Sequence, residues 1–359
     1  MDKIAKNSDR TRKSLLEHAD AYPKLQITDV FKYLFHSSFG CEHLVTDGET
    51  ALEYINREYE AMPKGEAPLV ERLDGEYSRV HLSCLDGGLK AKTLARLFCL
   101  SAKQELHGRE ALEEKLAVTG ELVCEGKLPF DKADFDRALS SWRERGYPAV
   151  HHSDGFKAEY APSYRVVANR YADILGLFFR IDGLGDKDLI VAIEGGSASG
   201  KTTLASILEE VYGASVFHMD DFFLRPEQRT PERLSEVGGN VDRERFISEV
   251  LTPLKKNGIV RYRPFDCGKM SLGKTVEVKP KRLTVVEGVY SMHPKFERYY
   301  DLSVYLDIDK EYQKARILRR NSEEHAKRFF EEWIPLEDVY FTEHGIKGSS
   351  DVVISVKEI

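Results

Sequence analysis

The 359-residue sequence predicts an α/β fold in its C-terminal half, a parallel sheet with helices on both faces, preceded by a mostly helical α+β domain. Two observations predict the α/β half. Short apolar, β-rich runs alternate there with helical patterns, which is typical of a parallel sheet covered on both faces. A glycine-rich loop also follows the first of these runs. Because the turn-rich stretch 182–186 separates the halves, we expect domains at 1–181 and 182–359.

The first half predicts helices and one strand. Apolar residues recur there at helical spacing over seven segments. The alternating stretch Glu76–Ser83 predicts a strand or a hairpin arm. The predicted helices are Asp9–Ala21, Ile27–Phe35, Glu49–Ala61, Leu89–Leu106, Glu110–Glu125, Lys132–Arg145 and Ser163–Phe179.

The second half predicts five strands with helices between most of them. The stretch Arg261–Pro280 interrupts the alternation and predicts a β-hairpin insert near 260–280. The predicted strands are Asp188–Ile193, Ser215–Met219, Arg282–Val286, Leu302–Leu306 and Asp351–Val356, and the predicted helices are Lys201–Tyr212, Arg243–Lys256 and Lys310–Trp333.

The loop between the first of these strands and the first helix reads Gly-Gly-Ser-Ala-Ser-Gly-Lys-Thr over 195–202, a complete G-x-x-x-x-G-K-[ST] phosphate-binding motif. Its backbone N–H groups and the helix N-terminus can cradle a triphosphate. Lys201 can reach the β- and γ-phosphates, and the Thr202 hydroxyl can ligate Mg²⁺. We therefore expect ATP and Mg²⁺ as cofactors, with nucleotide contacts from Gly195, Ser197, Ala198, Ser199, Gly200, Lys201, Thr202 and Thr203.

Acidic residues follow four of the predicted strands, and ligands bind at this edge of a parallel sheet. They are Glu194, Asp220 with Asp221, Glu287, and Asp307 with Asp309. Asp220 is the candidate base or Mg²⁺-water ligand, because phosphoryl transfer to an alcohol needs a carboxylate to take the hydroxyl proton. Glu287 lies in Val-Val-Glu-Gly, directly after the third predicted strand, at the position of a Walker-B-type acid. With Thr202, these two carboxylates are the predicted Mg²⁺ site.

Arginines on the last predicted helix are candidate cations for the transferred phosphate. Arg316 and Arg320 are four residues apart and therefore share one helix face. A solvated surface stripe is the alternative interpretation. After the fourth strand of such a domain, we favour a lid near 316–333 that closes over the triphosphate and excludes water.

The order of these motifs resembles the uridine kinase/phosphoribulokinase-like branch of P-loop small-molecule kinases, over the C-terminal half only. The motifs are the phosphate loop, Asp-Asp-Phe-Phe at 220–223, Gly-Asn-Val-Asp at 239–242, Tyr-Arg-Pro-Phe-Asp at 262–266, Val-Val-Glu-Gly at 285–288 and the arginine lid. The resemblance implies that Asp220 is the general base, Asp242 holds substrate hydroxyls and Glu287 is the Mg²⁺-linked acid. It also places Phe223 and Phe265 where uridine kinases carry base-contacting tyrosines, and matches Arg316 and Arg320 to lid arginines.

The function predicted from these residues is an ATP-dependent kinase of a small hydroxyl-bearing metabolite. A nucleoside such as uridine or cytidine is the first acceptor to consider. Phe223 and Phe265 lack the hydroxyls that would select a pyrimidine, so a sugar, glycerate or a vitamin-like alcohol stays open as the acceptor. A hypothesis of another class is a regulatory P-loop ATPase whose helical half binds a protein.

The composition restricts partners and location. A net charge of −7 argues against a general nucleic-acid or anionic-membrane binder, and no run approaches the roughly 18 apolar residues of a membrane span. Five dispersed cysteines fit reduced thiols, so we expect a cytoplasmic protein with a small-molecule substrate, its oligomeric state open, a homo-oligomer included. His36, Cys41 and His43 suggest a metal site, but no second ligand cluster at zinc spacing accompanies them.

Overall fold

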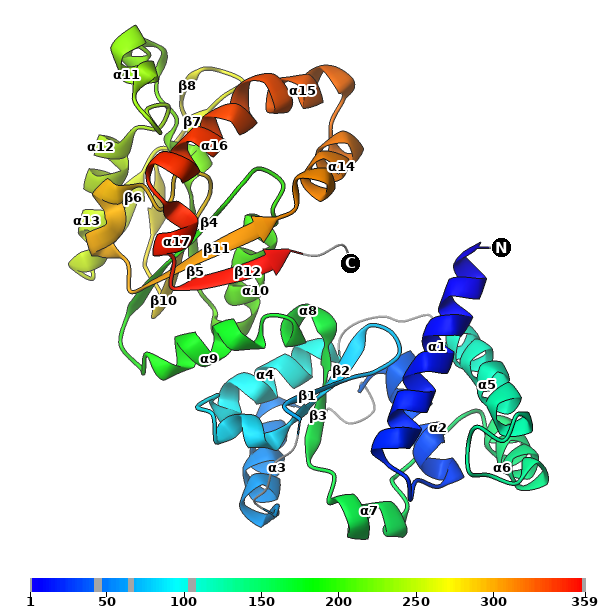
Figure 1. The fold of residues 1–359 in the computed structure, drawn as a ribbon. Coiled ribbons are helices and arrows are strands. Elements are labelled where there is room, and N and C mark those ends of the chain that lie inside the picture. Colours follow the sequence, from blue (N-terminus) through cyan, green and yellow to red (C-terminus); the bar gives the residue numbers. More distant parts are fainter. Residues whose placement is uncertain (1, 42–46, 64–67, 103–107, 357–359) are drawn as a thin grey trace. The chain divides into compact units, whose positions relative to one another are not determined.

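The chain divides into two compact units, Met1–Gly183 and Leu184–Ile359 (Figure 1). The structure is a computed structural model that describes residues 2–41, 47–63, 68–102 and 108–356. None of the helices in these ranges is long and apolar enough to cross a membrane.

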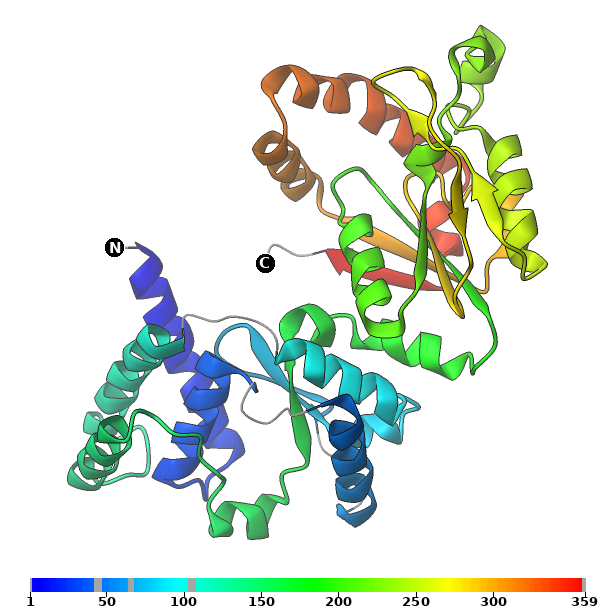
Figure 2. The same ribbon diagram turned by 180° about the vertical axis from the view of Figure 1, so that it is seen from behind.

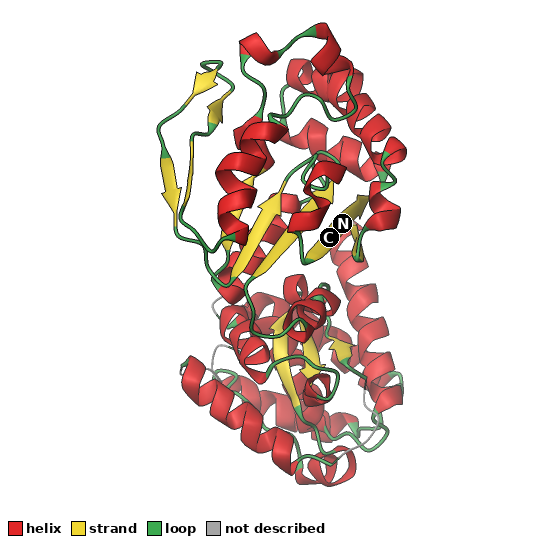
Figure 3. Ribbon diagram, turned by 90° about the vertical axis from the view of Figure 1, so that its left-hand side faces the viewer, coloured by secondary structure: helices red, strands yellow, loops and turns green. Residues whose placement is uncertain are grey.

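The N-terminal unit is mostly helical and contains one small antiparallel sheet with the strand order β1-β2-β3 (Figure 3). This arrangement confirms the predicted α+β class. The strands are β1 (Val70–Arg72), β2 (Tyr77–His81) and β3 (Tyr164–Ala168). The helices are α1 (Asp2–Ala21), α2 (Ile27–Phe39), α3 (Gly48–Ala61), α4 (Ala91–Ser101), α5 (Gly108–Cys124), α6 (Lys132–Glu144), α7 (Asp154–Tyr160), α8 (Asn169–Ala172) and α9 (Leu175–Gly183), with a 3₁₀ turn η2 at Leu82–Leu85.

The predicted helix Ser163–Phe179 is wrong over its first part. Residues Tyr164–Ala168 form β3, which pairs antiparallel with β2 and sets Tyr77 opposite Ala168. Consecutive residues Val166 and Val167 are both buried, so both faces of the strand are covered and pairing outweighs the helical spacing. The predicted helix Leu89–Leu106 ends as α4 at Ser101, and its residues 103–106 lie outside the described residues.

The C-terminal unit is built on a five-stranded sheet with the order β12-β11-β4-β10-β5. Every neighbouring pair in it is parallel. The sheet strands are β4 (Leu189–Gly195), β5 (Ser215–His218), β10 (Leu283–Glu287), β11 (Leu302–Ile308) and β12 (Val352–Val356). The helical elements are α10 (Lys201–Tyr212), η3 (Met219–Phe222), η4 (Pro226–Gln228), α11 (Pro231–Ser235), α12 (Arg243–Phe246), η5 (Ile247–Leu251), α13 (Thr252–Lys255), η6 (Pro294–Tyr299), α14 (Lys310–Arg320), α15 (Glu323–Arg328), η7 (Phe329–Trp333), α16 (Ile334–Glu343) and α17 (Ile346–Ser349).

Helices cover both faces of this sheet, as predicted (Figures 1 and 2). Helix α10 packs against β4, β5 and β10 through an apolar face that includes Leu204 and Leu208. On the other face, sheet residues such as Ile190 and Phe217 share one buried cluster with Phe246 of α12 and Tyr340 of α16. The central strands β4 and β10 are therefore buried on both sides, which explains their nearly continuous apolar sequence, whereas the edge strand β12 is partly exposed.

The stretch expected as an insert forms two short antiparallel ladders. Strand β6 (Val260–Tyr262) pairs with β9 (Val276–Val278), and β7 (Phe265–Asp266) pairs with β8 (Ser271–Leu272). Strand β7 lies against η3, the turn that carries Asp220 and Asp221. The hairpin therefore covers the carboxyl end of β5.

The predicted helix Lys310–Trp333 is interrupted after Arg320. Ser322 is extended and its hydroxyl accepts a hydrogen bond from the His325 N–H, so it acts as the N-cap of a new helix, α15. Serine is favoured at this position because its hydroxyl oxygen accepts a hydrogen bond from an otherwise unpaired N–H of the first helical turn. The helix α16 that follows was not predicted.

Candidate functional site

The phosphate loop joins the central strand β4 to α10, and two of its glycines have backbone conformations that other residues rarely adopt. Gly195 has φ +147° and Gly200 has φ +101°. A Cβ atom on Gly195 would also lie 2.7 Å from the Leu306 carbonyl oxygen of the neighbouring strand β11. The loop can therefore adopt this path only with glycine at these positions.

A cavity of about 520 Å³ opens beside this loop. The Lys201 Nζ lies at the loop, where it donates hydrogen bonds to the carbonyl oxygens of Gly195 (2.9 Å) and Gly196 (3.0 Å). The cavity is lined by Ser197, Ala198, Gly200, Lys201, Thr202, Thr203, Ser206, Asp220, Glu287, Gly288, Val289, Ile317, Arg320, Asn321 and Phe329. Most of the predicted nucleotide-binding residues therefore line one cavity with two of the predicted carboxylates.

Asp220 and Glu287 reach the cavity from neighbouring strands. Glu287 is the last residue of β10, and Asp220 lies in η3 directly after β5. The Thr202 hydroxyl donates to Glu287 Oε1 over 3.2 Å. Desolvation raises the pKa of Asp220, opposed by the Lys201 charge and reinforced by Glu287. The carboxylate therefore holds a proton more tightly than an ordinary aspartate does.

His218 is a residue of this site that the sequence alone did not single out. It ends β5 opposite Glu287 in the register of the two strands, and its Nδ1 lies 2.6 Å from Glu287 Oε1. This hydrogen bond is the main cause that raises the pKa of His218. Its place at a strand end, next to Asp220, was the available signal.

The other strand-end acids have structural partners. Glu194 is fully buried and accepts hydrogen bonds from the N–H groups of Gly195 (2.9 Å) and Met292 (3.1 Å). Asp307 pairs with Lys347 at 2.8 Å, and Asp309 caps α14. Only two of the four strand ends with acids therefore contribute carboxylates to the cavity.

The two predicted lid arginines lie on α14. Arg320 lines the cavity. Arg316 stacks its guanidinium 5.5 Å from the centre of the Tyr312 ring, and a Cβ atom on Gly200 would lie 3.9 Å from Arg316 Nη1. Within the described residues, neither arginine forms an ion pair with a carboxylate. Both charges are therefore available to an anionic ligand.

Asp242, which we predicted to hold substrate hydroxyls, already has protein partners. Asp242 is 2% exposed, and its carboxylate accepts hydrogen bonds from the Arg245 N–H (3.1 Å) and from Gln228 Nε2 (2.9 Å). A substrate hydroxyl that binds Asp242 would have to displace Gln228. Phe265 is buried in β7, and Phe223 is partly buried and bridges to Val241.

Asp221 has protein partners as well. Its Oδ2 accepts a hydrogen bond from the Tyr262 hydroxyl over 3.2 Å, and its carbonyl oxygen accepts one from Arg245 Nη2 over 2.8 Å. These bonds tie the turn after β5 to the hairpin and to α12. Asp221 therefore fixes the turn that carries Asp220.

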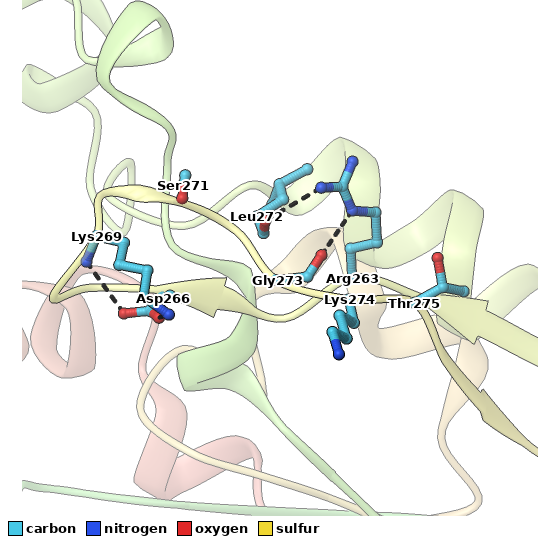
Figure 4. A pocket seen from close by; sticks show the side chains of 8 residues that line it. All are labelled: Arg263, Asp266, Lys269, Ser271, Leu272, Gly273, Lys274 and Thr275. Atoms are coloured by element: carbon cyan, nitrogen blue, oxygen red, sulfur yellow. Dashed lines mark hydrogen bonds and ion pairs between the residues drawn. The ribbon is translucent and has the colours of Figure 1, made fainter.

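A second hollow, of about 540 Å³, lies on the hairpin itself (Figure 4). Its charged groups are engaged locally. Arg263 donates to the carbonyl oxygens of Gly273 (2.8 Å) and Leu272 (3.1 Å), and Lys269 pairs with Asp266 at 3.3 Å. These contacts stabilise the hairpin tip.

The metal hypothesis for the N-terminal half gains no support. Among the residues that the structure describes, no group of three or more His, Cys, Asp or Glu side chains could hold a metal ion. The Cys41 thiol is buried and donates toward the Val166 carbonyl oxygen at 3.4 Å. His36 is buried, and His43 lies outside the described residues.

The residues of the cavity fit ATP and Mg²⁺. Lys201 and Arg320 supply cations in the cavity, Arg316 lies beside Gly200 of the loop, and the loop supplies N–H groups at the start of α10. Thr202 and Glu287 offer two oxygens 3.2 Å apart. Mg²⁺ commonly takes few protein ligands and fills its remaining positions with water and phosphate oxygens, so this sparse set suits it.

Sequence comparison agrees with this geometry. The chain is 30% identical over 141 residues to a uridine kinase of Chlamydia pneumoniae, and the match covers 37% of this chain and 62% of that protein. It is 26% identical over 157 residues to a uridine kinase of Geobacillus kaustophilus, covering 41% of this chain and 73% of that protein. The C-terminal half is uridine kinase-like.

The matches to these relatives cover 37% and 41% of this chain, so more than half of the chain lies outside each of them. The chain also spans less than two thirds of the Chlamydia protein, 62% of its length. No protein-family model matches the chain. The solved structure of a possible uridine kinase from Bacillus stearothermophilus overlaps 52% of this chain and 99% of its own, with 23% identity and a TM-score of 0.41.

Proposed function

We propose that the C-terminal unit is a kinase that transfers the γ-phosphate of ATP to a hydroxyl group of a small metabolite. One observation carries the proposal: Asp220, a carboxylate suited to take a hydroxyl proton, lines the same cavity as Lys201 and Thr202. A nucleotide-binding switch needs the loop and the lysine, but it does not need a second carboxylate on the acceptor side.

Each residue then has a task in the transfer. Lys201 and the loop N–H groups hold the phosphates, and Arg320 with Arg316 neutralises the charge that develops on the transferred group. Thr202 and Glu287 would hold Mg²⁺, which would supply further charge neutralisation. Asp220 accepts the proton of the attacking hydroxyl, and its raised pKa makes it a better base than an ordinary aspartate.

A nucleoside is the first acceptor we propose, because the relatives are uridine kinases. Phe223 and Phe265 would form apolar walls for the base. A sugar, glycerate or a vitamin-like alcohol remains the alternative, because these walls offer no hydroxyl to select a pyrimidine.

A phosphate-transfer screen tests the proposal. The full chain is incubated with Mg²⁺ and γ-labelled ATP against nucleosides, sugars, glycerate and vitamin alcohols, and labelled products are separated. We expect labelled phosphate in one class of alcohol. ATP hydrolysis that no alcohol stimulates would contradict a kinase and favour the regulatory ATPase.

A further inference from the structure

Ser197 of the phosphate loop is held by side chains from two helices that lie far along the chain. Its N–H donates to Glu337 Oε2 over 2.9 Å, and its hydroxyl donates to Glu337 Oε1. Its carbonyl oxygen accepts a hydrogen bond from Gln313 Nε2 over 2.8 Å. All three polar groups of this loop residue are therefore bound by α14 and α16.

The two holding side chains are buried inside the unit. Gln313 is 3% exposed and Glu337 is 4% exposed. A Cβ atom on Gly196 would lie 2.8 Å from Gln313 Nε2 and 3.6 Å from Glu337 Oε2. The second glycine of the loop therefore leaves the space in which both side chains reach Ser197.

Helix α16 makes a second contact near the start of the loop, through a residue one helical turn after Glu337. The Tyr340 hydroxyl donates to Glu194 Oε2 over 3.1 Å, and Glu194 directly precedes Gly195. Residues three apart lie on the same helix face, so one face of α16 carries both contacts. The contact with Ser197 therefore belongs to an extended interface between helix and loop.

Gln313 and Glu337 flank the segment that covers the cavity. Arg320 and Phe329 lie between them in the sequence, and both line the cavity. Arg316, beside Gly200, lies between them as well. The segment with the arginines is therefore anchored at both of its ends to one residue of the loop that holds the phosphates.

We propose that Glu337 is a positioning residue that fastens the base of the arginine-bearing lid to the phosphate loop, so that loop and arginines bind the triphosphate as one preformed unit. The proposal rests on the proposed kinase function and assigns Glu337 no contact with the reacting atoms. Preformed contacts strengthen binding because they remove the entropy cost of ordering loop and lid when ATP arrives.

The matched variants are Glu337→Ala, Glu337→Gln and Asp338→Ala in the full chain. Alanine removes both acceptors, whereas glutamine keeps one for the Ser197 N–H and can donate to the Ser197 hydroxyl. Asp338 is the control, since it is the next residue of α16 and forms an exposed ion pair with Lys310 of α14. That pair also joins the two helices but does not touch the loop.

The readouts are the affinity for ATP, protection of the lid from trypsin by ATP, and the KM for ATP together with kcat. We expect Glu337→Ala to weaken ATP binding and raise KM about 10-fold or more, because a buried hydrogen bond to a charged group is lost. ATP should also no longer protect the lid in this variant. Glu337→Gln should stay within about 3-fold of wild type, and Asp338→Ala within about 2-fold, as for a surface ion pair.

Wild-type ATP affinity and lid protection in Glu337→Ala would overturn the proposal, and so would an equal loss in Asp338→Ala. If Glu337→Ala does not fold, Ser197→Ala tests the same contact from the loop side, where it removes one of the two bonds. The binding and proteolysis readouts need no acceptor. They therefore distinguish failure of this proposal from failure of the kinase assignment.

Discussion

The Nδ1 atom of His218 lies 2.6 Å from Oε1 of Glu287. The same carboxylate oxygen accepts the hydrogen bond of the Thr202 hydroxyl over 3.2 Å. The contact follows from the sheet, because β5 and β10 are parallel neighbours in which His218 and Glu287 are register partners. The imidazole therefore fixes the orientation of the carboxylate that faces the loop.

The pair of His218 and Glu287 makes the stability of the folded protein depend on pH. The hydrogen bond to Glu287 raises the pKa of His218 above its usual 6.5. The stability that the pair contributes is therefore fully present below 6.5 and is lost as the pH rises through the raised pKa. We expect an NMR titration to give His218 a pKa above 6.5 in the wild type and a lower value in Glu287→Gln. Equal values in the two proteins would contradict the pairing.

Lys201 is expected to be essential for binding the triphosphate. Lys201→Ala removes the ammonium group at the loop, and we expect phosphate transfer to fall about 100-fold or more, since a charged donor to the phosphates is lost. Isothermal titration with ATP and the transfer assay measure this. Lys187→Ala is the matched control, because Lys187 lies in the same unit and pairs at 3.4 Å with Asp301. A similar loss in the control would show a general effect of removing a lysine.

Buried Glu194 is expected to make the stability of the C-terminal unit depend on pH. Burial raises the pKa of Glu194 from 4.5 to about 7. The stability it contributes is thus present below 4.5 and is lost as the pH rises through about 7, because the buried carboxyl must then ionise. We expect the difference in melting temperature between wild type and Glu194→Gln to shift in favour of the variant from pH 5 to pH 8. Parallel pH curves for the two proteins would show that Glu194 is not the source.

Local sequence patterns predicted the parts of the fold that depend on local structure. Helix α10 begins and ends at Lys201 and Tyr212, as predicted, because the loop glycine and Gly213 limit it at its two ends. Strand β3 was missed because its conformation is decided by pairing with β2, and that contact is not visible in the local spacing of apolar residues. Helix α16 was missed as well, because its apolar residues do not form a simple stripe.

The residues of the candidate site also fall into two groups, those that local sequence patterns predict and those that only the tertiary structure brings together. Lys201 and Thr202 belong to a continuous motif, and Asp220 and Glu287 follow from the rule that parallel strand ends meet at one edge. His218 carried the same signal and was overlooked. Glu337 had no sequence signal, because it meets Ser197 across 140 positions and depends on the path of α14 and α16.

The central claim, that Asp220 is the base of a phosphate transfer, is tested most directly by Asp220→Asn in the transfer assay, with ATP binding measured on the same sample. We expect the variant to bind ATP with near wild-type affinity and to lose transfer to the acceptor by about 10²- to 10⁴-fold, the usual contribution of a general base. Unchanged transfer in the variant, or ATP turnover that no alcohol stimulates and that survives the substitution, would contradict the claim.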